Sequence, residues 1–109
     1  MPVVRIPTSR IDDWESFHDV FANTLGFPDY YGRNMDAWID CMRDADEHDN
    51  MRSVTADSGD VLTLFLEDCE SFRDRCPDQY SELVECSGFV NAGRIEAGKR
   101  AILALAFDG

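Results

Sequence analysis

The chain has few basic residues for its length. Among 109 residues it holds ten lysines and arginines, of which Lys99 is the single lysine, against 22 aspartates and glutamates. The formal net charge of -12 repels phosphate backbones and anionic membranes and attracts basic proteins. Direct nucleic-acid binding is therefore disfavoured and a basic protein partner is favoured. Acidity that serves only solubility, or a salty cytoplasm, is the alternative explanation of the same balance.

Long hydrophobic runs are also lacking. The first ten residues, MPVVRIPTSR, contain no apolar region of the kind found in export signals, and no stretch approaches the length needed to cross a bilayer. We therefore expect a cytoplasmic protein with no membrane association. The chain length and its 44% hydrophobic content suit one compact core, so a single domain over residues 1–109 is predicted.

Residue types that commonly carry catalysis are scarce. The two histidines, His18 and His48, have no nucleophile at a recognisable spacing, and the sequence contains no glycine-rich phosphate-binding loop and no nucleophile elbow. For His18, a structural role at the edge of an apolar helix face is expected. A small hydrolase using Asp36 and Asp40 is disfavoured, because acidic pairs arise by chance in so acidic a chain. No enzymatic activity and no cofactor are predicted.

No metal site is predicted either. The cysteines follow no zinc spacing, which favours buried or half-buried free thiols at Cys41, Cys69, Cys76 and Cys86. The acidic segment DADEHDN fails as a calcium loop, because Asp49 stands where glycine is required and Thr55 where glutamate is required. An exposed acidic connection over Ala45–Asp60 is predicted instead.

Short apolar runs alternate with helical patterns along the chain. Strands are predicted at Val3–Pro7, Val61–Leu66 and Ala101–Phe107, and the last two are nearly continuous apolar runs, which is typical of buried parallel strands. Helices are predicted over residues 12–25, 34–44 and 67–76 and from Pro77 onward. The order β-α-α-β-α-α-β predicts an α/β fold, a small three-stranded parallel sheet with helices packed on it.

Local signals refine the first and last of these helices. Asp12 with Glu15 three residues later predicts a capping box, and Gly26 predicts the end of the first helix. In the last helix, the glycines at 88 and 93 are expected to break or bend the chain. One face of that helix is predicted to carry Tyr80, Leu83 and Val84.

The segment PDYYGRNMDAWIDCM, residues 28–42, combines a loop with the start of a helix. Asn34 is a good N-cap for that helix. Its core face is predicted to hold Met35, Trp38, Ile39 and Met42. On another face, Asp36, Asp40 and Asp44 follow one another at intervals of one turn, and we call these three residues the acidic ridge.

Stability alone does not account for the acidic ridge. Like charges at this spacing destabilise a helix by roughly 0.2–0.5 kcal/mol per pair. Asp36 lies in the first turn, where the helix dipole favours a negative charge, but Asp40 has only Arg43 as local support. A binding role and a merely solvated acidic face both remain open from the spacing.

The segment YYGRNMDAWIDCM resembles the signature of the barstar family, intracellular inhibitors of a secreted bacterial ribonuclease. The matching positions are Tyr30, Tyr31, Gly32, Asn34, Asp36, Ala37, Asp40 and Cys41. The resemblance implies the barstar-like fold, which agrees with the predicted element order. Its strength is concentrated in residues 26–42.

The resemblance also implies a site and a partner. In the family, the loop and second helix enter the active site of a basic ribonuclease, where the acids stand in for RNA phosphates. The implied partner-binding residues here are Tyr30, Tyr31, Gly32, Asn34, Asp36, Asp40 and Asp44. Asp40 is the central acid, Asp36 its neighbour, and Tyr30 the aromatic that covers a catalytic histidine. A basic, extracellular-type bacterial ribonuclease is the implied partner, and the free protein is expected to be a monomer.

The sequence departs from the family pattern at several places. Arg33 stands where an acid is usual, so Arg33→Glu is expected to strengthen binding to a basic partner. The helix tryptophan is shifted to Trp38 with Ile39 in its place, the connection at 45–60 is longer, and the contact acid of the last helix has no clear counterpart between Val84 and Ala97. A binding module of the same fold that docks a different basic protein is the alternative function.

Overall fold

Within residues 3–44 and 61–109, the part of the chain that the computed structural model describes, three strands and four α-helices alternate. In chain order the elements are β1 (Val3–Pro7), the 3-10 helix η1 (Thr8–Arg10), α1 (Trp14–Leu25), α2 (Met35–Arg43), β2 (Leu62–Glu67), α3 (Cys69–Arg75), α4 (Pro77–Glu96) and β3 (Leu103–Phe107). The predicted acidic connection over Ala45–Asp60 lies outside the described residues.

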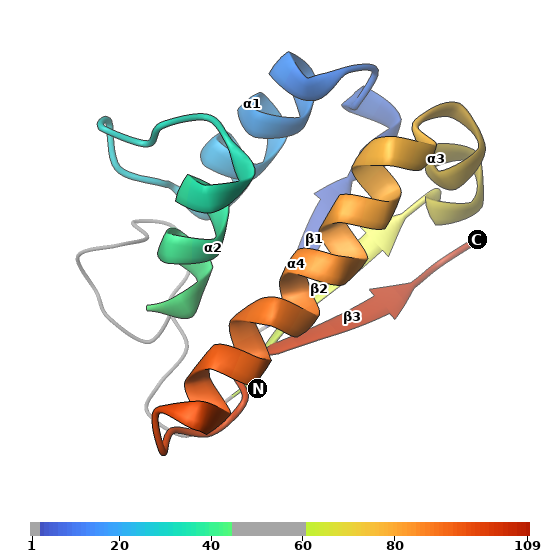
Figure 1. Ribbon diagram of the computed structural model, residues 1–109. Coiled ribbons are helices and arrows are strands. Elements are labelled where there is room, and N and C mark those ends of the chain that lie inside the picture. Colours follow the sequence, from blue (N-terminus) through green and yellow to red (C-terminus); the bar gives the residue numbers. More distant parts are fainter. Residues whose placement is uncertain (1–2, 45–60) are drawn as a thin grey trace.

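The three strands form one parallel sheet in the order β1-β2-β3. Val4 pairs with Leu64, which in turn pairs with Leu105 on the other edge strand. In Figure 1, α4 runs across the front of the sheet, with α1 above and α2 beside it. The predicted α/β architecture with a three-stranded parallel sheet is confirmed, and the strand positions differ from the predicted ones by no more than two residues.

The sheet is fully buried on one face only. Along β2 the side chains of Leu62, Leu64 and Leu66 are fully buried, whereas the residues between them are half-buried. On this second face the guanidinium of Arg5 lies 5.2 Å from the centre of the Phe65 ring. The prediction of a buried parallel strand therefore holds fully for one face of β2, and the other face is half-buried.

The N-cap of helix α1 lies one residue later than predicted. The side chain of Asp13, not of Asp12, accepts a 2.8 Å hydrogen bond from the backbone N–H of Ser16, and the Ser16 hydroxyl accepts from the Asp13 N–H at 3.0 Å. Serine thus supplies the reciprocal half of the capping box that Glu15 was expected to supply. The helix ends where predicted, at Gly26 in the left-handed conformation with φ of 71°.

Helix α4 is continuous from Pro77 to Glu96, so of the predicted break or bend at Gly88 and Gly93, the break does not occur. Its inner face is buried against the sheet and α2 over most of its length, at Leu83, Cys86, Ser87, Val90 and Arg94. This packing outweighs the roughly 1 kcal/mol by which each interior glycine disfavours a helix. Val84, expected on the inner face, is instead 38% exposed.

All four cysteines are free and buried, which confirms the prediction of free thiols. Over the residues described, none of the helices has the length and apolar character required to span a membrane.

Candidate functional site

The loop between α1 and α2 carries the two adjacent tyrosines. The backbone N–H of Tyr31 donates to the Pro28 carbonyl at 2.9 Å, which closes a tight turn. Tyr31 is buried at 9% exposure, while Tyr30 is 80% exposed. Tyr31 therefore anchors the loop to the core, and Tyr30 projects from the loop into solvent.

The anchor is an aromatic cluster beneath the loop. The Tyr31 ring lies 4.7 Å from the ring of Phe27 and 5.5 Å from that of His18, measured between centroids. The Tyr31 hydroxyl and His18 Nδ1 are hydrogen-bonded at 2.6 Å. Burial raises the pKa of the Tyr31 phenol and lowers the pKa of His18, so both groups are neutral near pH 7. His18 has the structural role predicted for it, although it is buried at 4% exposure and not at an edge.

The end of the loop is shaped by Arg33 and Asn34. Arg33 adopts the left-handed conformation with φ of 56°, and Asn34 returns to an extended conformation with φ of -143°. The Asn34 side chain accepts a 2.8 Å hydrogen bond from the Ala37 N–H, which confirms it as the N-cap of α2. Its Nδ2 also donates to the Gly32 carbonyl at 3.3 Å, so one side chain holds both the loop and the helix start.

Helix α2 separates its faces largely as predicted. Trp38 and Met42 are fully buried, Met35 and Ile39 are half-buried, and Cys41 adds a fifth member to the core face. The Trp38 ring meets the edge of Phe21 on α1 at 5.8 Å between centroids. The helix is therefore fixed to the core on one side while its acids lie on the other.

Of the acidic ridge, Asp36 and Asp40 are exposed, and Asp44 is half-exposed at the C-cap of α2. No hydrogen bond or ion pair joins Asp36 or Asp40 to another described residue. Since neither acid is neutralised within the described chain, both are available to cations from outside.

The Cys41 thiol beneath the ridge is unreactive, chiefly because it is buried. Burial, followed by the charges of Asp40 and Asp44, raises the pKa of Cys41 to about 11. A thiol with this pKa is protonated near pH 7 and is a poor nucleophile. Cys41 therefore belongs to the packing of α2 and offers no catalytic chemistry.

The negative region extends from α2 onto α4. Burial, together with a hydrogen bond to Glu82, raises the pKa of Cys86 to about 11, and the charges of Glu82, Glu85 and Asp36 add to the effect. These three acids therefore lie within electrostatic range of one thiol. The sequence does not predict that Glu82 and Glu85 lie near Asp36, because no local pattern indicates which face of α4 packs beside α2.

Buried Arg94 holds the two helices together at their far ends. Its guanidinium donates to the carbonyl of Arg43, the last residue of α2, at 2.7 Å, and to the carbonyl of Arg100 at 2.8 Å. The Arg43 side chain also lies against α4 at Gly93, where an added Cβ would make an ordinary contact of 3.5 Å with Arg43 Nη2. The position of α2, and with it the acidic ridge, thus depends on α4.

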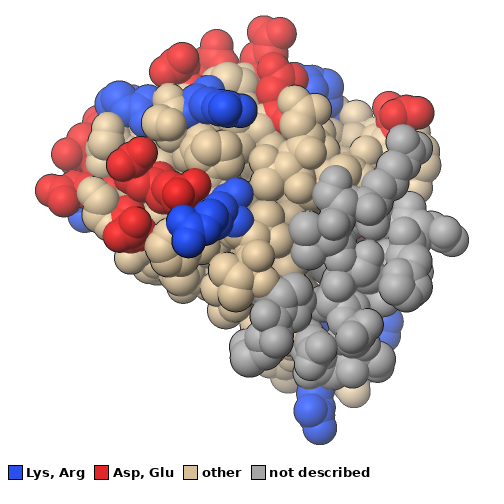
Figure 2. All heavy atoms as spheres, turned by 180° about the vertical axis from the view of Figure 1, so that it is seen from behind, with Lys and Arg blue, Asp and Glu red and all other residues tan. Residues whose placement is uncertain are grey.

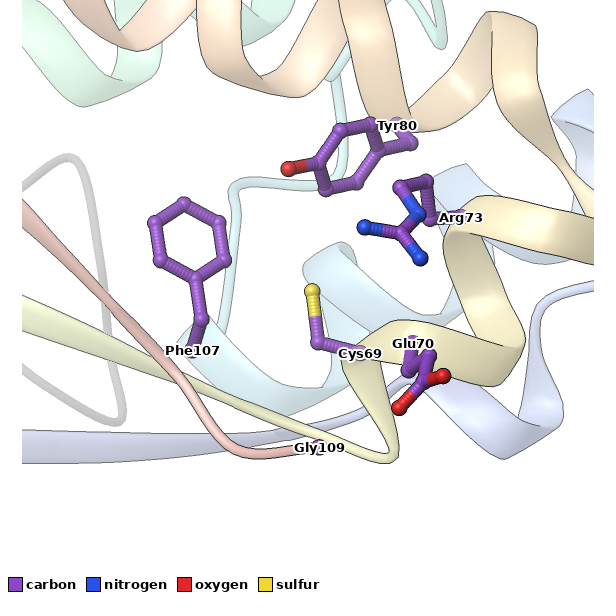
Figure 3. Close-up of a pocket in the computed structure, with 6 residues that line it drawn as sticks. All are labelled: Cys69, Glu70, Arg73, Tyr80, Phe107 and Gly109. Atoms are coloured by element: carbon purple, nitrogen blue, oxygen red, sulfur yellow. The ribbon is translucent and has the colours of Figure 1, made fainter.

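A hollow away from the ridge offers no catalytic site. A cavity of about 310 Å³ opens at the ends of β2 and β3 and is lined by Cys69, Glu70, Arg73, Tyr80, Phe107 and Gly109. Figure 3 shows the Arg73 guanidinium between Tyr80 and the Cys69 thiol, with the Glu70 carboxylate turned away. Burial raises the pKa of Cys69 despite the charge of Arg73, so no activated nucleophile faces this cavity.

Metal chemistry has no support in the described part of the chain, where no group of three or more His, Cys, Asp or Glu side chains could hold an ion. The described site is a surface of one exposed aromatic side chain beside uncompensated acids on a rigid support. Such a surface suits binding of a basic protein better than catalysis.

Comparison with known proteins gives two matches. The family model described as "Barstar (barnase inhibitor)" matches residues 1–100. A curated protein of Bacillus subtilis (strain 168), named "Putative ribonuclease inhibitor YrdF", is 57% identical over 28 residues. That alignment covers 26% of this chain and 31% of the relative, so the chain spans about a third of the curated relative it matches.

Proposed function

Because the chain belongs to the barstar family, we propose that it is a cytoplasmic inhibitor, an immunity protein, of a basic, extracellular-type bacterial ribonuclease. The free protein is a monomer in this proposal and needs no cofactor. Its docking surface consists of Tyr30, Gly32, Asn34, Asp36, Asp40 and Asp44, supported from below by Tyr31. The function is occlusion of the active site of the ribonuclease, without enzymatic activity of its own.

The observation that carries the proposal is the exposed, uncompensated pair Asp36 and Asp40. Like charges one turn apart destabilise a helix of nine residues, and no described residue pairs with either of them. Meanwhile the opposite face of α2 is fixed to the core by Trp38 and Met42. An arrangement that costs stability but holds two carboxylates in a fixed position is expected where a cationic partner supplies the missing countercharges.

The proposed mechanism is substitution of carboxylates for phosphates. A ribonuclease holds the phosphates of RNA with arginine, lysine and histidine side chains. In the complex, Asp40 and Asp36 meet these cations, and the exposed ring of Tyr30 covers the active-site histidine. RNA is then excluded by charge neutralisation and by steric occlusion. Asp44 and the α4 acids Glu82 and Glu85 extend the negative surface at the edge of the contact.

The alternative, a binding module for a different basic protein, is favoured by one feature. Arg33 is a cation in the loop that precedes the ridge, where the family pattern has an acid. A partner with an acidic group opposite Arg33 would differ from barnase, the ribonuclease that the family description names.

An inhibition assay tests the proposed function. RNA cleavage by barnase is measured with increasing amounts of the wild-type protein, of Asp40→Ala and of Asp74→Ala. Asp74 is the matched control, because it is an exposed acid on α3, away from α2, and its removal changes the net charge equally. Inhibition by the wild type and by Asp74→Ala, but not by Asp40→Ala, is the expected result. A wild-type protein that neither binds barnase nor slows its cleavage of RNA would favour the alternative, in which the partner is a different basic protein.

A further inference from the structure

The left-handed backbone of Arg33 calls for a stabilising contact. A φ of 56° is a conformation that residues with a side chain rarely adopt, and here it redirects the chain between Gly32 and the N-cap of α2. Without support, this turn would interconvert with extended conformations. The side chain of Arg33 shows where the support comes from.

The Arg33 guanidinium turns toward α1. One nitrogen, Nη2, lies 2.7 Å from Oδ1 of Asp19 and donates a second hydrogen bond to the Glu15 carbonyl at 3.0 Å. Both side chains of the ion pair are about half exposed, so the charge attraction alone contributes little. Its effect is geometric, because two contacts on one helix fix the direction of the side chain.

A second contact lies on the other side of Gly32. The buried Tyr31 hydroxyl is hydrogen-bonded to His18, the residue that precedes Asp19 in α1. Two neighbouring residues of α1 therefore hold two loop residues that flank a single glycine. Next to these contacts, a hollow of about 260 Å³ is lined by Trp14 and His18 of α1 and by Arg33, Asn34 and Met35.

We propose that α1 preorganises the partner-binding loop, and that Arg33 and Asp19 are positioning residues for this loop, not contacts to the partner. The inference rests on the proposed function, in which this loop binds the ribonuclease. A loop held in its bound conformation loses less entropy on association, which slows dissociation of the complex. Because Asp19 neutralises Arg33 within the chain, the cation does not repel a basic partner.

The proposal reverses one sequence-based expectation. Arg33→Glu was expected to strengthen binding by removing a like charge from the contact. With Asp19 2.7 Å from the guanidinium, a glutamate at position 33 would face a carboxylate and release the loop. Weaker binding is therefore the expected result of Arg33→Glu.

A charge-swap experiment separates positioning from charge at the contact. Association and dissociation rates with barnase are measured for the wild type, Arg33→Glu, Asp19→Arg and the double variant Arg33→Glu/Asp19→Arg. Arg10→Glu is the control, since Arg10 is exposed in η1 and its replacement changes net charge as Arg33→Glu does. We expect each single variant to dissociate at least fivefold faster, and the double variant to return to within twofold of the wild type. A double variant that dissociates as fast as Arg33→Glu, or a single Arg33→Glu variant that binds more tightly, would overturn the proposal.

Amide hydrogen exchange provides a readout without the partner. The N–H groups of Tyr31 and Ala37, which donate to Pro28 and Asn34, are expected to exchange at least fivefold faster in both single variants and at the wild-type rate in the swap. The amide of Leu64 in β2 is the internal control for global stability. If barnase does not bind but exchange follows this pattern, the proposed function fails and the positioning role stands; unchanged exchange in the single variants contradicts the positioning role.

Discussion

Tyr30 and Tyr31 are adjacent and chemically identical, yet Tyr30 is exposed and Tyr31 is buried. The tight turn at Pro28 directs one ring outward and the other into the aromatic cluster with Phe27 and His18. The sequence alone marks both tyrosines as site residues. It could not separate them, because the turn and the helix that receives Tyr31 come together only in the folded chain.

Individual side chains of the acidic ridge were easier to predict. Asn34 as N-cap and the helix period together place Asp36 and Asp40 on the exposed side, and the structure agrees. These assignments needed only residues within one turn of each other. The contact of Arg33 with Asp19 spans fourteen residues, and no local pattern indicates it.

At the residue scale, the lowered pKa of His18 is expected to make the stability of the protein depend on pH. Burial, followed by the charge of Arg33, holds the pKa of His18 below its usual 6.5, and the charge of Asp19 opposes the shift. The unfolded chain then binds a proton more readily than the folded one. The contribution of His18 is therefore complete above about pH 6.5 and is lost as the pH falls through the lower pKa of the folded state.

Urea unfolding of the wild type and of His18→Gln, at intervals between about pH 7 and pH 5, measures this contribution, since glutamine can keep a hydrogen bond but does not titrate. The wild type is expected to lose more stability than the variant over this range. Equal losses would show that His18 titrates alike in the folded and unfolded chains.

At the scale of elements, agreement with the sequence depended on how local the signal was. Val3–Pro7, with its β-branched residues and terminal proline, forms the predicted strand. The end of α1 at Gly26 and the start of α4 at Pro77 also follow from single residues. Gly88 misled the prediction, because the packing of α4 on the sheet and α2 overrides local propensity.

The same glycine gives a prediction for stability. Gly88 is exposed in the interior of α4, and a Cβ added there would meet nothing within 4 Å. Gly88→Ala should stabilise the protein by about 1 kcal/mol, because alanine favours the helix and reduces the freedom of the unfolded chain. Urea unfolding measures the change. A destabilised variant would indicate that α4 is distorted at this position.

At the scale of the whole molecule, the net charge of -12 is unevenly distributed. Seen from behind, in Figure 2, acidic and basic side chains intermingle over the left and upper part of the view, beside a broad uncharged area. On α2, by contrast, Asp36 and Asp40 stand without a described counterion. In the proposed mechanism, the overall negative field draws a basic partner toward the molecule and the acidic ridge receives it.

Electrostatic attraction of this kind should appear in the association rate. We expect the rate constant for association with barnase to fall steeply as salt rises from about 0.01 M to 0.15 M, where the screening length shortens from about 30 Å to about 8 Å. Stopped-flow mixing measures the rate. An association rate that does not change over this range would remove electrostatic steering from the mechanism.

The central claim is that Asp40 is present for binding and not for folding, and paired measurements on Asp36→Ala and Asp40→Ala test it most directly. Asp36→Ala should lower the stability by about 0.3–1 kcal/mol, because it removes an acid from the first turn of α2. Asp40→Ala should be neutral or slightly stabilising. Binding should rank in the opposite order, with Asp40→Ala costing roughly 2–5 kcal/mol in the dissociation constant for barnase and Asp36→Ala costing less. An Asp40→Ala protein that unfolds more readily but inhibits barnase as well as the wild type would contradict the claim and reduce the acidic ridge to a structural feature.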